Sequence, residues 1–317
     1  MYSRIVGTGS HLPEKVLTNF DLEKMMDTTD EWIRDRTGIE RRHIAAEGET
    51  TVDLAEQAAR RALDAAGVAP SEIDFIVFGT TTPDLIFPNC GVLLQERLGC
   101  RGGPAFSLET ACTGFIYALS IADKFIKAGE AKCALVIGAE NLSRITDWKD
   151  RSTAVLFADG AGAVVLKPSA EPGIVSTHLH ADGAYSNLLY CGSGVSKGLS
   201  TTPTILMSGN EVFKVAVTKL GQAVDEALAA NNLQKSEIDW LVPHQANSRI
   251  IQAMARKLDM SMERGIVTVQ DHGNTSAASV PLALDTGVRD GRIKPGQLLL
   301  LESFGGGFTW GSALVRF

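Results

Sequence analysis

The stretch SEIDFIVFG (residues 71–79) recurs in closely similar form as SEIDWLVPH (residues 236–244). Each copy follows an amphipathic helical pattern, at residues 50–67 and 211–231, and each passes from a polar turn into a short apolar run. A short apolar run bounded by turn residues is typical of a buried strand. Because helix, turn and strand occur twice in the same order, the sequence predicts an internal duplication.

The correspondence extends along the chain. The helical pattern after Cys112 leads to an apolar strand at residues 133–138, and the one after Asn274 leads to another at residues 297–301. Each half then closes with a glycine-rich hairpin. Apolar strands that alternate with helices predict mixed, largely parallel sheets covered by helices. We therefore expect an α/β fold built from two similar mixed-sheet halves, residues 1–170 and 171–317.

Composition limits the class of protein. The 317 residues are 44% hydrophobic and 21% charged, which is typical of a soluble globular protein with a sizeable core. The net charge of −7 argues against nucleic acid and anionic membranes as partners. No apolar stretch approaches membrane-spanning length, and no apolar leader segment is evident. The five widely spaced cysteines match neither a disulfide framework nor a zinc motif, so we expect a reducing cytoplasm.

Cys112 is the first candidate catalytic residue. It lies in ETACTGF (residues 109–115), between an apolar approach and a predicted helix. The unpaired amides and the positive dipole end of a helix favour a thiolate, which is a nucleophile at neutral pH. A free cysteine is also among the most frequently buried residues, so a structural role is the competing interpretation.

Two later motifs strengthen the catalytic interpretation: PHQAN (residues 243–247) and HGNTS (residues 272–276). If the two halves superpose, Cys112 and Asn274 fall at equivalent strand-to-helix turns, and His244 falls at the end of its strand. Three reactive side chains from both halves would then meet where the halves join, at the carboxyl ends of strands.

These residue types suit the formation of a carbon–carbon bond. A thiolate accepts an acyl group from a thioester, while a histidine and an asparagine can each donate a hydrogen bond to an enolate oxygen. The glycines at 305–307 would let backbone amides approach a second oxyanion. A papain-like protease uses cysteine, histidine and asparagine as well, but such enzymes usually carry disulfides and lack this duplicated pattern.

The chain resembles the thiolase superfamily and, within it, the bacterial β-ketoacyl-acyl carrier protein synthase III enzymes. The resemblance covers essentially the whole chain. It is carried by GTGS (7–10), DEWI (30–33), RTGI (36–39), ACTGF (111–115), HQAN (244–247), GNTSAAS (273–279) and FGGGFTWG (304–311). It implies a thiolase-like duplicated fold with layers in the order α-β-α-β-α. It also implies initiation of fatty acid synthesis by decarboxylative condensation, with no metal and no redox cofactor.

The resemblance also assigns roles to residues. Cys112 is implied as the acylated nucleophile, His244 and Asn274 as the pair that stabilises the decarboxylating malonyl thioester, and the backbone amides of Cys112 and Gly306 as the oxyanion hole. The implied coenzyme A contacts are Thr28, Trp32, Arg36, Thr37, Arg151, Gly209, Asn210, Phe213, Ala246 and Asn247, with the adenine between Trp32 and Arg151. The implied acyl pocket comprises Phe87, Phe157 and Phe304. The implied docking surface for the carrier protein comprises Lys214, Arg249, Arg256 and Lys257.

Partners and primer follow from the same resemblance. We expect acyl-CoA and malonyl-acyl carrier protein as substrates, and a homodimer in which Phe87 closes the partner's acyl pocket and restricts the primer to a short acyl group such as acetyl. The apolar strand at residues 133–138 is a candidate for the dimer interface. Two alternatives stay open: a related condensing or acyl-transfer enzyme of secondary metabolism, and a non-catalytic scaffold that binds the carrier protein.

Overall fold

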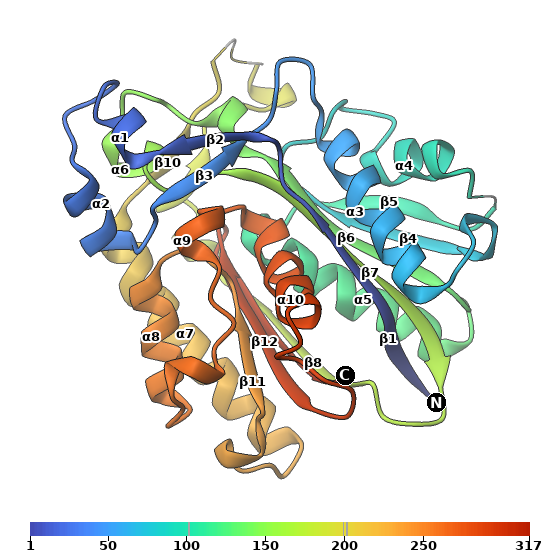
Figure 1. Cartoon of the computed structure of the whole chain (residues 1–317). Helices are drawn as coiled ribbons and strands as arrows, with labels where there is room; N and C mark the ends of the chain where they lie inside the picture. The colour runs from blue at the N-terminus through green and yellow to red at the C-terminus, as the bar shows by residue number, and fades with distance from the viewer. Residues whose placement is uncertain (101, 199, 201) are drawn as a thin grey trace.

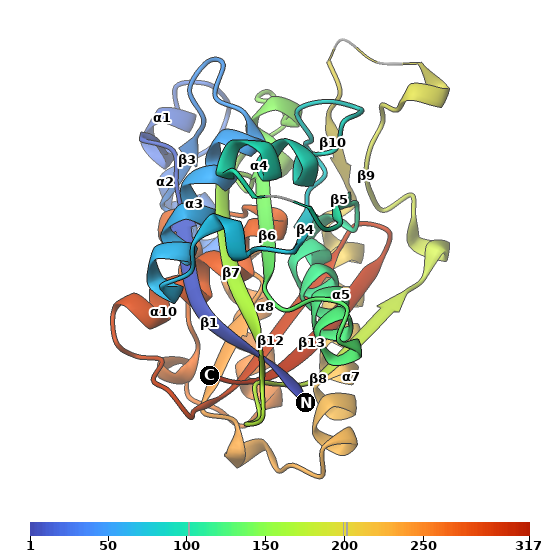
Figure 2. The same ribbon diagram turned by 90° about the vertical axis from the view of Figure 1, so that its right-hand side faces the viewer.

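The computed structural model describes residues 1–100, 102–198, 200 and 202–317, and two sheets form its centre (Figures 1 and 2). The first sheet has the strand order β1-β7-β6-β4-β5. Its strands are β1 (Tyr2–His11), β4 (Phe75–Gly79), β5 (Ala105–Leu108), β6 (Ala134–Asn141) and β7 (Asp159–Ser169). Strand β4 runs parallel to β5 and β6, whereas β7 is antiparallel to both of its neighbours. The prediction of a mixed sheet in the first half is therefore confirmed.

The second sheet has the order β11-β12-β13-β8. Its strands are β8 (Ile174–Ala181), β11 (Trp240–Pro243), β12 (Leu298–Gly305) and β13 (Thr309–Arg316). Strand β11 is parallel to β12, and the other pairs are antiparallel. The chain passes from the first sheet to the second between Ser169 and Ile174.

Helices cover both sheets and fill the space between them. Helices α3 (Thr51–Ala66) and α4 (Cys90–Leu98) pack on the outer face of the first sheet. Helices α5 (Gly114–Ala128) and α10 (Ser279–Arg289) share one hydrophobic core with both sheets and form the central layer. Helices α7 (Gly209–Ala230) and α8 (Ser248–Lys257) cover the outer face of the second sheet. This arrangement confirms the expected α-β-α-β-α layers.

Shorter elements surround these layers. The small strands are β2 (Lys15–Thr18), β3 (Arg41–Ile44), β9 (Leu189–Cys191) and β10 (Ile205–Met207). The short α-helices are α1 (Asn19–Leu22), α2 (Asp30–Thr37), α6 (Arg151–Ala154) and α9 (Val269–His272). The 3₁₀ turns are η1 (Pro70–Glu72), η2 (Ala111–Thr113), η3 (Leu142–Ile145), η4 (Gly183–Tyr185), η5 (Val195–Lys197), η6 (Lys235–Glu237), η7 (Met262–Arg264) and η8 (Ser276–Ala278). In the part of the chain that is described, no helix is long and apolar enough to cross a membrane.

The repeated Ser-Glu-Ile-Asp sequence makes the same contacts in both halves. Each glutamate caps its own turn: the Glu72 carboxylate accepts from the Ala69 amide at 3.0 Å, and the Glu237 carboxylate accepts from the Gln234 amide at 2.7 Å. Each aspartate then ties β4 or β11 to the next parallel strand. The Asp74 carboxylate accepts from the Cys133 amide at 3.0 Å, and the Asp239 carboxylate accepts from the Leu298 amide at 2.7 Å. The duplication seen in the sequence is thus a duplication of hydrogen bonds.

The backbone corrects the expected alignment of Cys112 with Asn274. Ala111 has φ +49° and Ser276 has φ +50°, and each begins a 3₁₀ turn of three residues that leads directly into a helix. When these matching turns are aligned, Cys112 corresponds to Ala277. Asn274 lies two residues before the turn that contains Ala277. Moreover, Asn274 follows the short helix α9 rather than a strand, and only a single bridge between Leu241 and Gly265 occupies the place of β5.

The structure also contradicts the expectation that the apolar strand at residues 133–138 pairs across a dimer interface. Residues 134–138 of this run belong to strand β6, which is paired with β4 on one side and with β7 on the other. A strand bonded on both sides has no free edge with which to pair across an interface. Strand β5 instead forms one edge of the first sheet.

Candidate functional site

Cys112, His244 and Asn274 line one cavity of about 400 Å³. Cys112 comes from η2 in the first half, whereas His244 directly follows β11 and Asn274 precedes η8 in the second half. The expected convergence of these three side chains is therefore present in the fold. The cavity wall also contains most of the expected coenzyme A contacts: Trp32, Arg36, Thr37, Gly209, Asn210, Phe213, Ala246 and Asn247.

The remaining sequence-predicted residues divide into two groups. Phe157, Phe304 and Arg249 line the same cavity. Residues outside its wall are Thr28, Phe87, Arg151, Lys214, Arg256, Lys257 and Gly306. Phe87 is 82% exposed, so it does not close the acyl pocket of its own chain. Lys257 makes an ion pair of 2.5 Å with Asp225, while Lys214 and Arg256 are exposed on the neighbouring helices α7 and α8.

Cys112 is not poised as a thiolate in the way that its place before a helix suggested. Only 6% of the residue is exposed, and burial raises the pKa of its thiol to about 12. A hydrogen bond with Ser276 acts to lower this pKa, and the nearby charge of Glu140 acts to raise it. The loss of solvation outweighs the favourable helix end, because an anion in an apolar cavity loses its hydration. The thiol is therefore protonated in the folded protein at neutral pH.

His244 is held in one orientation and is uncharged. Its Nδ1 lies 2.5 Å from the Ser279 hydroxyl, which also accepts a hydrogen bond from the Gln245 amide at 3.3 Å. We assign the Ser279 hydroxyl as the donor to Nδ1; in this tautomer the imidazole proton is on Nε2, where it can serve a ligand. Burial lowers the pKa of His244 to about 3, so the ring is a neutral hydrogen-bond donor rather than a cation.

Asn274 is positioned through both its backbone and its side chain. Its amide donates to the Leu156 carbonyl at 2.8 Å, and its own carbonyl accepts from the Ala158 amide at 2.9 Å. Its side-chain oxygen accepts from the Ser276 amide at 2.9 Å. Because the oxygen is used in this way, the side-chain NH₂ group is the part of Asn274 that can serve a ligand. His244 and Asn274 thus both present hydrogen-bond donors to the cavity.

The glycine-rich hairpin of the second half packs against the turn that holds Cys112. The Ser303 hydroxyl donates to the Cys112 carbonyl at 2.7 Å. A Cβ on Gly305 would lie 2.7 Å from the Cys112 amide nitrogen, and one on Gly306 would lie 3.7 Å from the Cβ of Ala111. A side chain at position 305 would collide with the nucleophile turn. This contact explains the need for glycine at position 305.

A cationic group lies around Trp32 beside the cavity. The guanidinium carbons of Arg36 and Arg151 lie 4.5 Å and 5.0 Å from the centre of the indole ring. Arg151 also donates to the Asp27 carbonyl at 2.9 Å. The Trp32 and Arg151 side chains are therefore in direct contact, and no space is open between them at the position expected for the adenine. The hydroxyl of Thr28 is buried without a hydrogen-bond partner in the described part of the chain.

Sequence analysis missed four polar residues near the site: Glu140, Ser276, Ser279 and Glu302. The two carboxylates left a signal, because each interrupts an apolar strand: Glu140 ends the run that begins at Cys133, and Glu302 follows the four leucines at positions 298–301. Glu302 lines the cavity with both carboxylate oxygens buried and unpartnered among the described residues, and burial raises its pKa to about 8. The two serines stand in the quoted motif GNTSAAS, but no spacing rule identified their partners. The described residues contain no group of three or more histidine, cysteine or acidic side chains that could hold a metal.

Comparison with known proteins shows which family the whole chain is similar to. The 3-oxoacyl-[acyl-carrier-protein (ACP)] synthase III family matches residues 106–183, and its C-terminal family matches residues 228–317. A β-ketoacyl-(acyl-carrier-protein) synthase III of Thioalkalivibrio sulfidiphilus is 63% identical over 320 residues, which cover 100% of this chain and 99% of that protein. A crystal structure of 3-oxoacyl-(acyl-carrier-protein) synthase III from Aquifex aeolicus VF5 is 48% identical and superposes with a TM-score of 0.95, covering 99% of this chain and 100% of that one. The corresponding crystal structure from Pseudomonas aeruginosa PAO1 is 41% identical with a TM-score of 0.94, covering 100% and 98%.

Proposed function

The chain belongs to the 3-oxoacyl-(acyl-carrier-protein) synthase III family, and from this premise we propose roles for the residues of its cavity. It is an acyl-transferring condensing enzyme that initiates fatty acid biosynthesis. The reaction joins the acyl group of an acyl-CoA to malonyl-acyl carrier protein and yields β-ketoacyl-acyl carrier protein, CoA and CO₂. The observation that carries our assignment is that Cys112, His244 and Asn274, from separate halves, line one cavity.

Cys112 accepts the acyl group in the first half-reaction. Its sulfur attacks the thioester carbonyl of acyl-CoA, and the CoA thiolate leaves after the tetrahedral intermediate collapses. The backbone amides of Cys112 and Gly306 hold the oxyanion of this intermediate. The packing of the glycine-rich hairpin on the Cys112 turn supports this role, because it brings the two backbones together without intervening side chains.

His244 and Asn274 serve the second half-reaction. Loss of CO₂ from the malonyl group leaves an enolate, whose oxygen accepts hydrogen bonds from the His244 Nε2–H and the Asn274 NH₂ group. The low pKa of His244 supports this role, because a neutral imidazole can donate from Nε2 without adding a charge to the buried cavity. The enolate carbon then attacks the acyl group on Cys112, and the sulfur is released.

Trp32 and its two arginines provide the site for the nucleotide end of coenzyme A. The indole offers a stacking surface for an adenine, and Arg36 and Arg151 offer positive charge to phosphates. To stack between Trp32 and Arg151, the adenine must displace the guanidinium from the ring. The pantetheine arm then follows Gly209, Asn210, Phe213, Ala246 and Asn247 along the cavity wall, with Thr37 beside them.

The acyl primer is short and the active form is a homodimer. Phe87 is 82% exposed between Ile86 and Pro88, as expected of a ring that a second chain buries, while Phe157 and Phe304 narrow the cavity from within. The free edge of β5 supports a dimer through this side of the first sheet. Light scattering will test the dimer, and turnover of decanoyl-CoA faster than acetyl-CoA would contradict the short primer.

The malonyl carrier protein docks on the exposed cations of α7 and α8. Lys214, Arg249 and Arg256 are exposed there, and Arg249 lies at the cavity wall. A local cluster of cations on a chain of net charge −7 would steer an acidic partner to the cavity. Lys257 contributes less than expected from the sequence, because its ammonium group is paired with Asp225. We place the reaction in the cytoplasm, where the five free cysteines stay reduced.

One experiment tests the division of labour. The protein is incubated with acetyl-CoA and examined by mass spectrometry, and malonyl-acyl carrier protein is then added and the products are analysed. We expect an acetyl adduct on Cys112 and release of the β-ketoacyl carrier protein. Absence of the adduct would overturn the assignment of Cys112. The alternative role in secondary metabolism has no supporting observation in the cavity, and the same product analysis would detect it.

A further inference from the structure

Glu140 is a buried carboxylate that the roles assigned above do not use. It lies near the end of β6 and is fully buried. Five donors converge on it: the hydroxyls of Thr80, Thr81, Thr82 and Ser276, and the Thr81 amide, at distances of 2.7 to 3.2 Å. Donors of this number favour an ionised carboxylate, whereas burial raises its pKa above the ordinary value. The protein therefore holds a desolvated carboxylate ready to accept a proton.

Ser276 joins this carboxylate to the nucleophile. Its hydroxyl donates to Glu140 at 3.1 Å, and it lies beside Cys112, where it acts to lower the pKa of the thiol. The left-handed conformation of Ser276, with φ +50°, and its position at the start of η8 bring this short side chain between the two groups. A path thus leads from the Cys112 sulfur through one hydroxyl to a carboxylate, and its second step, from Ser276 to Glu140, is a formed hydrogen bond.

The first half-reaction requires a base, and His244 does not supply it. The Cys112 thiol is protonated at neutral pH, so its proton must leave as the sulfur attacks the thioester. Burial lowers the pKa of His244, its Nδ1 is hydrogen-bonded to Ser279, and in the tautomer assigned above its Nε2 carries the proton. Among the described residues, Glu140 is the carboxylate that a hydrogen bond joins to Ser276, the residue beside the thiol.

We propose that Ser276 and Glu140 take the proton of Cys112 during acyl transfer, store it while the acyl group occupies the sulfur, and return it after condensation. The inference rests on the proposed role of Cys112 as the acyl carrier. As the S–C bond forms, the thiol proton passes to the Ser276 oxygen and the serine's own proton passes to Glu140. The CoA thiolate leaves and takes a proton from solvent. After decarboxylation and condensation, the released Cys112 thiolate recovers the stored proton, and Glu140 is again ionised.

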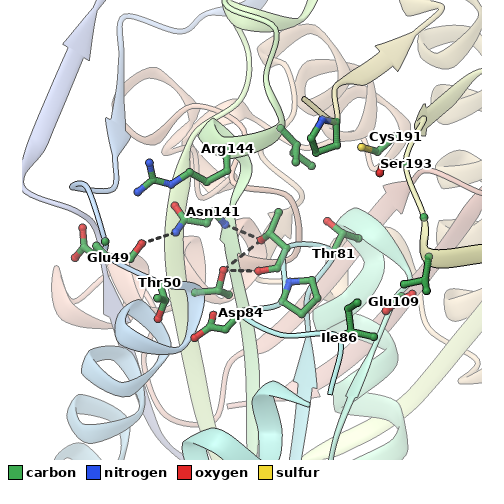
Figure 3. A pocket seen from close by; sticks show the side chains of 18 residues that line it. Glu49, Thr50, Thr81, Asp84, Ile86, Glu109, Asn141, Arg144, Cys191 and Ser193 are labelled. Carbon is green, nitrogen blue, oxygen red and sulfur yellow. Dashed lines mark hydrogen bonds between the residues drawn. The ribbon is translucent and has the colours of Figure 1, made fainter. Parts of the chain in front are cut away.

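The surroundings of Glu140 fit a proton store that lies apart from the substrate cavity. Thr81 and Thr82, which bind its carboxylate, also line a second cavity of about 750 Å³ with Asp84 and Arg144 (Figure 3). The other titratable groups affected by its charge are the thiols of Cys112 and Cys90. Ser276 lies beside the reacting thiol and is assigned as the catalytic residue that accepts its proton, while Glu140 acts through it.

Proton uptake distinguishes storage from a structural role. A stopped-flow indicator assay follows the solution pH at about neutrality while acetyl-CoA acylates the full-length enzyme, and mass spectrometry counts the acylated Cys112. Because the CoA thiolate takes its proton from solvent when the thiol proton is stored, we expect uptake of about one proton per acylated Cys112. Direct transfer of the thiol proton to CoA gives no uptake and overturns the proposal.

Variants complete the test. In Glu140→Gln and Ser276→Ala we expect the uptake to disappear and acylation to slow about 100-fold, while the rate of malonyl decarboxylation changes by less than about twofold. Asp285→Asn is the matched control, because Asp285 is another buried carboxylate held by two hydroxyls, those of Thr8 and Ser10. Ser276→Ala removes no buried charge and remains informative if Glu140→Gln does not fold. Acylation as fast as in Asp285→Asn, or an equal loss of both half-reactions, would overturn the proposal. Absence of acylation in the wild type would instead overturn the role of Cys112.

Discussion

The two halves of the molecule share a backbone but differ in chemistry at matching positions. In the first half, Gly79 ends β4 and Gly114 begins α5, and the two meet backbone to backbone: a Cβ on Gly79 would lie 2.6 Å from the carbonyl carbon of Gly114. At the corresponding positions of the second half, His244 and Ser279 are joined by a hydrogen bond of 2.5 Å. In the first half, two glycines leave no space for side chains at these positions. In the second half, the same positions carry His244 and the serine that is hydrogen-bonded to it.

The 3₁₀ turns show the opposite distribution. The first half carries Cys112, and the second carries Ala277 at the matching position. Each half therefore supplies what the other lacks: a nucleophile from one turn, and hydrogen-bond donors from the other half. A duplicated fold can therefore divide two half-reactions between its copies, because the equivalent turns η2 and η8 lie next to each other at the starts of the two central helices.

Cys112→Ala tests the comparison most severely, because it gives both turns the same residue. We expect condensation to fall by at least about 10⁴-fold, since no acyl group can be held, and mass spectrometry to detect no adduct after incubation with acetyl-CoA. Cys191→Ala, at an exposed cysteine, is the control and should retain activity. An acyl adduct on the Cys112→Ala variant would show that another residue is the nucleophile.

Asn274→Ala removes one donor from the second half only. Loss of a preorganised donor to an oxyanion costs about 10²- to 10³-fold in rate, so condensation should fall by that factor. Acylation of Cys112, measured by rapid quenching and mass spectrometry, should stay within about threefold of the wild type. If acylation falls as much as condensation, the separation of the two half-reactions is wrong.

Ser279→Ala makes the second half more like the first by removing the partner of His244. The ring then loses the hydrogen bond that orients it, which is worth about 1.4 kcal/mol, or about tenfold in the rate of malonyl decarboxylation. Ser120→Ala is the matched control. Ser120 is a helix serine whose hydroxyl oxygen lies 2.7 Å from that of Thr177, and neither residue lines the cavity. An unchanged decarboxylation rate would show that Ser279 does not position the ring.

Glu302→Gln tests a further difference between the halves. Glu302 lies in β12 of the second half, and the matching residue in β6 of the first half is the apolar Ile137. Burial raises the pKa of Glu302 from 4.5 to about 8, so the folded protein binds a proton that the unfolded chain loses in this range. The contribution of Glu302 to the free energy of unfolding is then fully present below pH 4.5. It falls by about 1.4 kcal/mol per pH unit as the pH rises to about 8. Urea unfolding across this range should show that Glu302→Gln removes the slope. A slope that persists in the variant would assign the titration to another group.

Much of this arrangement was predictable from local pattern. The copies of Ser-Glu-Ile-Asp indicated the duplication because each glutamate and aspartate bonds within its own half. Cys112, His244 and Asn274 were identified because their residue types and neighbouring motifs are distinctive. The alignment of Cys112 with Asn274 was three residues out, because the second half has a single bridge and the helix α9 in the place of strand β5, and no apolar run in the sequence indicates this change.

The remaining features depend on contacts between distant segments. The place of β6 inside its sheet follows from pairing with β7, and an apolar strand has the same appearance at an edge and in the centre. Ser276 and Glu140 became part of the site only through a hydrogen bond between residues far apart in the chain. Partners of this kind carry no periodicity or spacing that a single sequence can display.

The repeated helix–turn–strand units, the α/β class and the identity of the reactive side chains were therefore predictable, because they follow from short-range apolar patterns and residue chemistry. Which of these groups are ionised depends on the tertiary structure. Burial in the shared cavity protonates Cys112 and keeps His244 neutral, against the helix-end argument that the sequence supported. Solvation depends on everything that surrounds an atom, and those surroundings exist only once both halves have folded together.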